Sequence, residues 1–276
     1  MAVSYYYLVA ALPDINETRG ETREGSQGKD IPSFGDFIED MREVVPEKDG
    51  ELFSYVKLPF DNRNLINLLT ESEEEFSPFG NYTKEEMQAE IKRPADIPEY
   101  MSEFLKAYRE SRPVKQGLSW EDQLNSMFYE YAGECSNGFI ASWFTFDMDF
   151  RNTLAAINCR RHKLPLEKSL VHENEVTEML RKSNAADFGL SSYFQWAEKL
   201  FSLNFDDIPA SEKAIDDIKI DMAGEMPVPD LFSIETLLAF SVRLSIAERW
   251  AALDPEEGRK KLERIIDDLE NSYNVE

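Results

Sequence analysis

The chain has 276 residues, of which 42% are hydrophobic, with 18 Phe, 11 Tyr and 4 Trp. This is enough apolar side chain to build a large core, and it excludes global disorder. The formal net charge is −24 at pH 7, from 54 acidic and 30 basic side chains. Because such an acidic excess repels phosphate backbones and anionic lipid headgroups, it argues against nucleic acid and membranes as direct partners and favours a basic protein surface.

The first apolar stretch runs from Val3 to Leu12 and is ended by Pro13. It lacks a basic region before it and a small-residue cleavage motif after it, so a signal peptide is not expected. No apolar run approaches the roughly 18 residues of a membrane span. Cys135 and Cys159 show no pairing pattern, which fits a reducing compartment. We therefore expect a cytoplasmic protein, peripheral to the inner membrane only through a protein complex.

Helical patterns dominate the chain from Ser33 onward. The polar, glycine-containing residues 16–30 predict a mobile loop, and Leu52 to Leu58 is typical of a short extended piece that has no strand partners. Thr83 to Glu86 has the spacing of a capping box, and Asp254 to Glu257 has the acceptor, proline and acids of a helix start.

Three apolar stripes at helical spacing predict long helices. They comprise Ile140, Trp143, Phe144, Phe150, Leu154 and Ile157; Ile234, Leu237, Leu238, Leu244, Ala247 and Ala251; and Leu262, Ile265, Ile266, Leu269 and Tyr273. Helical spacing makes Trp143 a core residue rather than an exposed anchor, whereas Trp120 is open to either role. The fold class is all-α: one domain over residues 1–276, built of two or three related helical units stacked into an elongated or funnel-like body, with sub-units at about 1–115, 116–205 and 206–276.

One pattern recurs within the chain. Asp61 to Leu69 aligns with Asp149 to Ile157, with Asp, Arg and Asn at the same offsets and a separation of 88 residues, from position 61 to position 149. Asp230 to Phe232 is a weaker echo that lacks Arg and Asn. A repeat of this length predicts related helical units. The alternative is chance, since Asp and Asn favour helix starts and two helices can share the same opening.

This repeat resembles the helix openings of the C-subunit of V-type and archaeal-type ATPases, which is known as the d-subunit in eukaryotes. The resemblance lies in Asp61 with Asn64-Leu65, and in Asp149 with Asn152 followed by the basic residues Arg160, Arg161 and Lys163. Residues 5–13 and 146–152 also resemble an uncharacterised bacterial group encoded among V-type ATPase genes. The chain departs from the C-subunit family in being shorter and in lacking the motif in its third unit.

The resemblance implies a non-catalytic central-stalk component or accessory protein of a V-type ATPase, involved in proton transport. It would link the rotor axle to the membrane ring through protein–protein contacts. The repeat and its basic patch supply the candidate partner-binding residues: Asp61, Arg63, Asn64, Asp149, Arg151, Asn152, Arg160 and Arg161.

Motifs for chemistry are absent from the sequence. Gly28-Lys29 lacks the earlier Gly and the following Ser or Thr of a phosphate loop, and His162 and His172 lack the spacing of a zinc site. The acidic runs have no alternating loop positions for Mg²⁺ or Ca²⁺. We therefore expect no enzyme activity, no cofactor and no metal.

Two alternatives to the stalk hypothesis stay open. One is a stand-alone acidic helical adaptor that binds a basic protein. The other is an enzyme whose acids converge from distant helices, which a deep pocket with buried, perturbed carboxylates would favour and a closed core would not.

Overall fold

The computed structural model describes residues 5–13, 31–226, 228 and 230–251. Helices make up this part of the chain, and it contains no strand, so the all-α prediction is confirmed. The elements are α1 Tyr6–Ala11, α2 Phe34–Val44, α3 Glu47–Gly50, α4 Leu52–Leu69, α5 Lys84–Lys92, α6 Glu99–Arg109, α7 Trp120–Gly133, α8 Gly138–His162, η2 Leu166–Lys168, α9 Glu175–Lys182, η3 Leu190–Ser192, α10 Gln195–Phe201, α11 Ile208–Glu225 and α12 Ile234–Ala251.

Local capping explains where several helices begin. Ser33, Ser119, Asn137 and Asp207 each accept a backbone N–H in the first turn of α2, α7, α8 and α11. The capping box predicted at Thr83 is present, with Glu86 as its second member. These polar side chains satisfy donors that the helix itself leaves unpaired, and so fix the starting residue.

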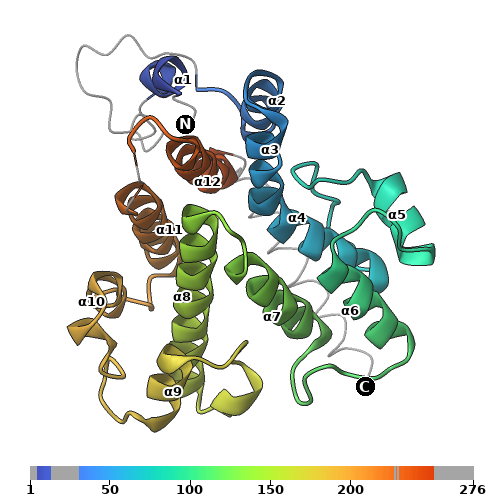
Figure 1. Cartoon of the computed structure of the whole chain (residues 1–276). Helices are drawn as coiled ribbons and strands as arrows, with labels where there is room; N and C mark the ends of the chain where they lie inside the picture. The colour runs from blue at the N-terminus through green and yellow to red at the C-terminus, as the bar shows by residue number, and fades with distance from the viewer. Residues whose placement is uncertain (1–4, 14–30, 227, 229, 252–276) are drawn as a thin grey trace, which may run out of the picture.

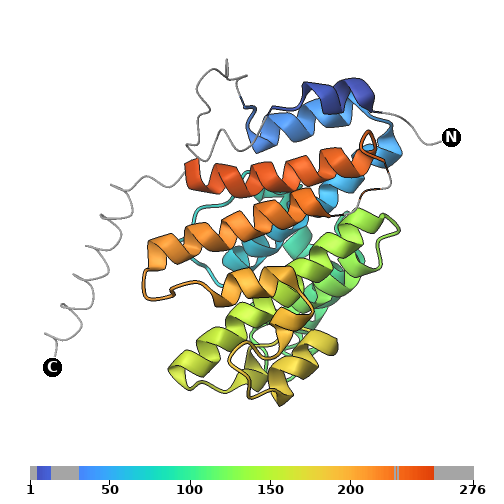
Figure 2. The same cartoon turned by 90° about the vertical axis from the view of Figure 1, so that its left-hand side faces the viewer.

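The long helix α8 lies at the centre of the molecule (Figure 1), between α7 and α11. It contacts α7, α9 and α12, and α12 in turn contacts α2, α4 and α11. In Figure 2, α11 and α12 run side by side across the molecule. Because α8 is covered from several directions, its buried residues are not confined to one stripe.

The predicted stripes agree with the core where the structure describes them. Ile140, Trp143, Phe144 and Phe150 of α8 are buried, as are Leu237, Leu238 and Leu244 of α12. Trp143 is therefore a core residue, as expected, and the partly buried Trp120 packs edge-on against Phe104 and Tyr108.

One predicted element differs from the structure, and three predictions fall on residues that the structure does not describe. The extended piece expected at Leu52 to Leu58 is wrong: these residues form the first two turns of α4, whose Phe53, Val56 and Leu65 are buried at helical spacing. The loop at 16–30, the helix start at Asp254 and the stripe from Leu262 to Tyr273 lie outside the described residues.

Within the described residues, no helix is both long and apolar enough to cross a bilayer. Cys135 and Cys159 are both free thiols, the second of them buried.

Candidate functional site

The repeated asparagines perform the same task in both halves of the molecule. Asn64 on α4 donates through Nδ2 to the Ser77 carbonyl (2.9 Å), and its Oδ1 accepts the Ser77 N–H (2.8 Å). Asn152 on α8 makes the same pair of bonds with Val171, both at 2.9 Å. In each case a buried amide imitates a backbone partner and fastens the loop that follows the long helix.

A second contact repeats one turn earlier on each helix. Asp61 accepts a hydrogen bond from Nδ2 of Asn81, and Asp149 accepts one from Nδ2 of Asn174 (2.8 and 2.6 Å). Both asparagines lie shortly before, or at, the start of the next helix, α5 or α9.

Contacts at corresponding positions also join the two long helices to α6 and α10, by a hydrogen bond in the first half and by aromatic packing in the second. The residue after each Asp, Asn62 or Phe150, contacts the second residue of the corresponding helix. Tyr100 donates to Oδ1 of Asn62 (2.8 Å), and Trp196 lies 5.5 Å from Phe150 between ring centroids. Two matching sets of hydrogen bonds, with a third contact at the same position, are more than chance similarity of two helix openings predicts.

The position of the motif differs from the sequence expectation. We expected Asp61 and Asp149 near helix starts, where Asp commonly caps, but both lie inside α4 and α8. Their carboxylates hold a loop that returns from far along the chain, so the helix-opening interpretation is wrong.

Asp61 is fully enclosed by its loop. It is 0% exposed, and its carboxylate also accepts the backbone N–H groups of Asn81 (2.8 and 2.9 Å) and Tyr82 (3.3 Å). A Cβ added to Gly80 would lie 2.2 Å from Oδ1 of Asp61, so only glycine permits this approach. Burial raises the pKa of Asp61 to about 6, although the Asn81 and Tyr82 donors act in the opposite direction.

Asp149 is held differently. Asp149 is almost completely buried, with 8% of its surface exposed. Within the described part of the chain, the amide of Asn174 is nevertheless its one hydrogen-bond donor. Asn174 is also the N-cap of α9, because its Oδ1 accepts the Thr177 N–H (2.9 Å). Burial raises the pKa of Asp149, with Asn174 and His172 acting in the opposite direction.

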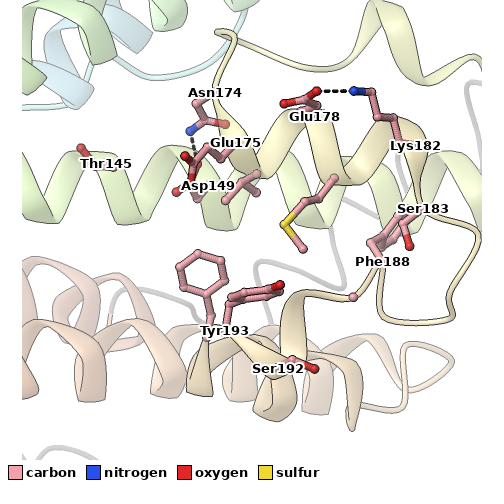
Figure 3. Close-up of a pocket in the computed structure, with 14 residues that line it drawn as sticks. Thr145, Asp149, Asn174, Glu175, Glu178, Lys182, Ser183, Phe188, Ser192 and Tyr193 are labelled. Atoms are coloured by element: carbon pink, nitrogen blue, oxygen red, sulfur yellow. Dashed lines mark hydrogen bonds and ion pairs between the residues drawn. The ribbon is translucent and has the colours of Figure 1, made fainter.

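A groove opens beside Asp149 (Figure 3). It runs over α8, between α9 and the segment of η3 and α10, with a volume of about 1020 Å³, and an adjoining hollow of about 620 Å³ continues toward the end of α11. Asp149, Thr145, Tyr193 and Phe194 line both parts. Tyr193 is 74% exposed, so its ring is accessible from the groove.

The charges along this groove are mostly negative. Its lining includes Asp149, Glu175, Glu178 and Glu225, against a single basic residue, Lys182. Lys182 forms an ion pair with Glu178 one turn away. Apolar walls with a net negative lining suit a ligand that is both apolar and cationic.

The predicted arginines are mostly engaged within the chain. Arg63 pairs with Glu74 (2.8 Å) and Arg151 with Asp122, and Arg161 pairs with Asp206 (2.8 Å). Arg160 donates to the carbonyls of three residues after α9 and lies 3.6 Å above the ring of Phe188. These contacts give each arginine a structural use, and a further contact with a partner stays a prediction.

Sequence reasoning missed Gly80, Asn81, Asn174, Tyr193 and the groove. Asn174 carried a detectable signal, since with Thr177 it forms a capping box. The groove carried none, because its walls come from separate helices.

Among the described residues, no group of three or more His, Cys, Asp or Glu could hold a metal ion. Asp149 has an amide as its hydrogen-bonding neighbour, which does not titrate. Within the described part of the chain, no titratable side chain therefore hydrogen-bonds to the Asp149 carboxylate.

Comparison with known proteins shows the family of this chain and nothing more. Residues 1–273 match the family model described as "Protein of unknown function (DUF2764)", and the chain therefore belongs to the DUF2764 family. No curated protein and no solved structure matches it.

Proposed function

We propose that this protein is a non-catalytic component of a V-type ATPase, resembling the C-subunit, that links the rotor axle to the membrane ring. The observation that carries the proposal is the repeated architecture: two long helices, α4 and α8, each use an Asp and an Asn to fasten the loop that follows. The polar residues of the motif hold the fold together, as expected of a protein that transmits force through packed helices rather than one that turns over a substrate.

Chemical function of the same residues has less support. A buried carboxylate in a groove is also what an enzyme would use as a general acid. Asp149 has no second titratable group within hydrogen-bond distance among the described residues, so binding is the better interpretation.

A stand-alone adaptor for a basic protein is the second candidate, and the net charge of −24 favours it independently of the repeat. Both candidates act through protein contacts. They differ in whether the partner belongs to a rotary ATPase, and in whether membrane association occurs through such a complex.

Affinity purification of the tagged full-length chain from its native host distinguishes the two. We expect V-type ATPase rotor subunits in stoichiometric amounts by quantitative mass spectrometry. Their absence from the eluate, when the input contains the intact ATPase, would reject the stalk proposal and leave the adaptor.

A charge reversal tests whether the basic patch takes part. Arg161→Glu should reduce recovery of rotor subunits, whereas Arg112→Glu should not. Each of these side chains is exposed and pairs with a single carboxylate of its own, but Arg112 lies outside the repeat and its basic patch. Arg160 is unsuitable for this test because it also anchors the residues after α9. Equal recovery with both variants would remove Arg161 from the interface.

A further inference from the structure

The two halves of the repeat differ at the carboxylate. In the first half, backbone N–H groups of Asn81 and Tyr82 close over Asp61 and leave it no exposed surface. In the second half, the one hydrogen bond that the described residues donate to Asp149 comes from the Asn174 side chain, and His172 of the same loop acts on it through charge. The second half therefore has a groove where the first has a closed loop.

The unfilled hydrogen-bonding capacity of Asp149 lies at the middle of this groove. An ionised carboxylate offers about four acceptor positions, and within the described residues one hydrogen bond is made. Leaving a nearly buried carboxylate with so few donors is unfavourable, which is consistent with its raised pKa. A cationic donor placed there would offset the free-energy cost of burying this carboxylate.

The walls on either side of Asp149 are apolar. Met179 and Phe188 line the larger part, Met222 lines the smaller part, and Phe194 lines both. In Figure 3, Tyr193 projects into the space below Asp149, opposite α9. Flexible methionines and an exposed aromatic are residues that commonly adapt to a partner's side chains.

We propose that this groove binds a basic amphipathic segment of a partner protein, with one Lys or Arg side chain on the Asp149 carboxylate. Charge complementarity selects this occupant: the lining carries four acids and one base, and the whole chain is strongly negative. Two adjoining hollows on either side of the carboxylate accommodate apolar side chains flanking the cation. The inference requires only that the protein acts through protein contacts, and it does not depend on the ATPase assignment.

A synthetic peptide tests the groove directly. The probe is a fluorescein-labelled amphipathic helix of about four turns, with Leu on one face and a single central Lys among them, and its control has Gln at that position. Fluorescence anisotropy with the full chain at physiological salt should show about tenfold tighter binding of the Lys peptide.

Mutations then assign the contact. Asp149→Asn preserves the shape of the side chain and should abolish the preference for Lys over Gln. Glu121→Gln removes an exposed acid on α7, outside the groove, and should preserve the preference. This double-mutant comparison separates a specific ion pair from attraction to a negative protein in general.

A second variant covers the case in which Asp149→Asn disturbs folding. Thr145 is exposed on α8, lines both parts of the groove and lies one turn before Asp149. Thr145→Arg places a cation beside the carboxylate and should block both peptides while circular dichroism shows a melting temperature no lower than that of the wild type.

The proposal is overturned if the wild-type chain binds neither peptide or does not distinguish them, or if Glu121→Gln reduces the Lys preference as much as Asp149→Asn. Unimpaired binding by a folded Thr145→Arg variant would also overturn it. None of these results depends on recovery of rotor subunits, so the two proposals fail separately.

Discussion

Asn64 and Asn152 show how one side chain can supply the backbone hydrogen bonds that a loop residue lacks outside a helix or sheet. Each is almost completely buried and pairs with both the N–H and the C=O of one loop residue. Since a buried backbone group without a partner is strongly unfavourable, these two amides determine where the loops can lie.

Removing either amide should destabilise the protein, and the loss should be larger for the fully buried Asn152 pair. Asn152→Ala leaves the Val171 N–H and C=O unpaired in the interior, and Asn64→Ala removes the partner of the same two groups of the half-buried Ser77. We expect each to lower the free energy of unfolding by about 2–4 kcal/mol, measured by urea denaturation. Asn152→Asp keeps the acceptor for Val171 N–H but loses the donor, so it should also destabilise. Losses below about 1 kcal/mol would contradict the structural role.

Because of Asp61, the free energy of unfolding should fall as the pH rises from acid to neutral. Its folded pKa of about 6 lies above the ordinary value of 3.8, so the folded state binds the proton more tightly than the unfolded state. The stabilisation is therefore present at low pH and lost as pH rises through this interval. Relative to Asp61→Asn, the wild-type free energy of unfolding should fall by about 2 kcal/mol between pH 4 and pH 7.

Chemical denaturation at each pH measures this difference, and groups common to both proteins cancel. Glu121→Gln serves as a reference for the loss of one exposed negative charge. A wild-type curve that runs parallel to that of Asp61→Asn, or that rises with pH, would show that the pKa of Asp61 is not raised.

At the scale of the elements, α8 organises the second half of the molecule. Its end carries Arg160, which donates to the carbonyls of Ser183 (3.1 Å), Ala185 (2.6 Å) and Ala186 (3.2 Å) and lies on Phe188. One guanidinium thus satisfies carbonyls that follow α9 and stabilises a wall of the groove.

Loss of that guanidinium should loosen residues 183–189 selectively. Arg160→Met retains an apolar stem over Phe188 but has no donors, so amide exchange in this segment should accelerate by about tenfold, as read by mass spectrometry. Arg161→Met is the matched control, because its exposed pair with Asp206 contributes little. Equal acceleration in both variants, or none in Arg160→Met, would contradict the anchoring role.

For the whole molecule, self-repulsion is the main consequence of composition. A net charge of −24 acts against the compact state, and the ion pairs that offset it, such as Arg63–Glu74 and Arg161–Asp206, lie largely in solvent.

Salt should therefore raise the melting temperature. The screening length falls from about 30 Å at 0.01 M to about 8 Å at 0.15 M, so repulsion between distant carboxylates weakens. For each kcal/mol that screening adds to the free energy of unfolding, we expect calorimetry to show a melting temperature about 2–4 °C higher. NaCl and KCl should act equally, because the effect is ionic strength rather than a specific ion. A constant or falling melting temperature would indicate that favourable ion pairs outweigh repulsion.

The sequence by itself determined the helical class, the capping box at Thr83 and part of the buried surface of α8 and α12. These depend on residues within a few positions of one another, where helix geometry fixes which side chains share a face. It also revealed the Asp–Arg–Asn repeat, because identical residue types recur at one spacing. The same local view gave Leu52 to Leu58 the wrong structure, since a short apolar run fits a strand or a buried helix equally.

Only the tertiary structure decided what the repeated residues do. Asp61 and Asp149 receive their partners from 20 and 25 positions further along the chain, and the route of a returning loop is not encoded in a local pattern. One loop brings backbone N–H groups to its carboxylate and the other brings one amide side chain. That difference separates a closed core from an open groove, because a buried carboxylate without enough donors remains a site for an added cation.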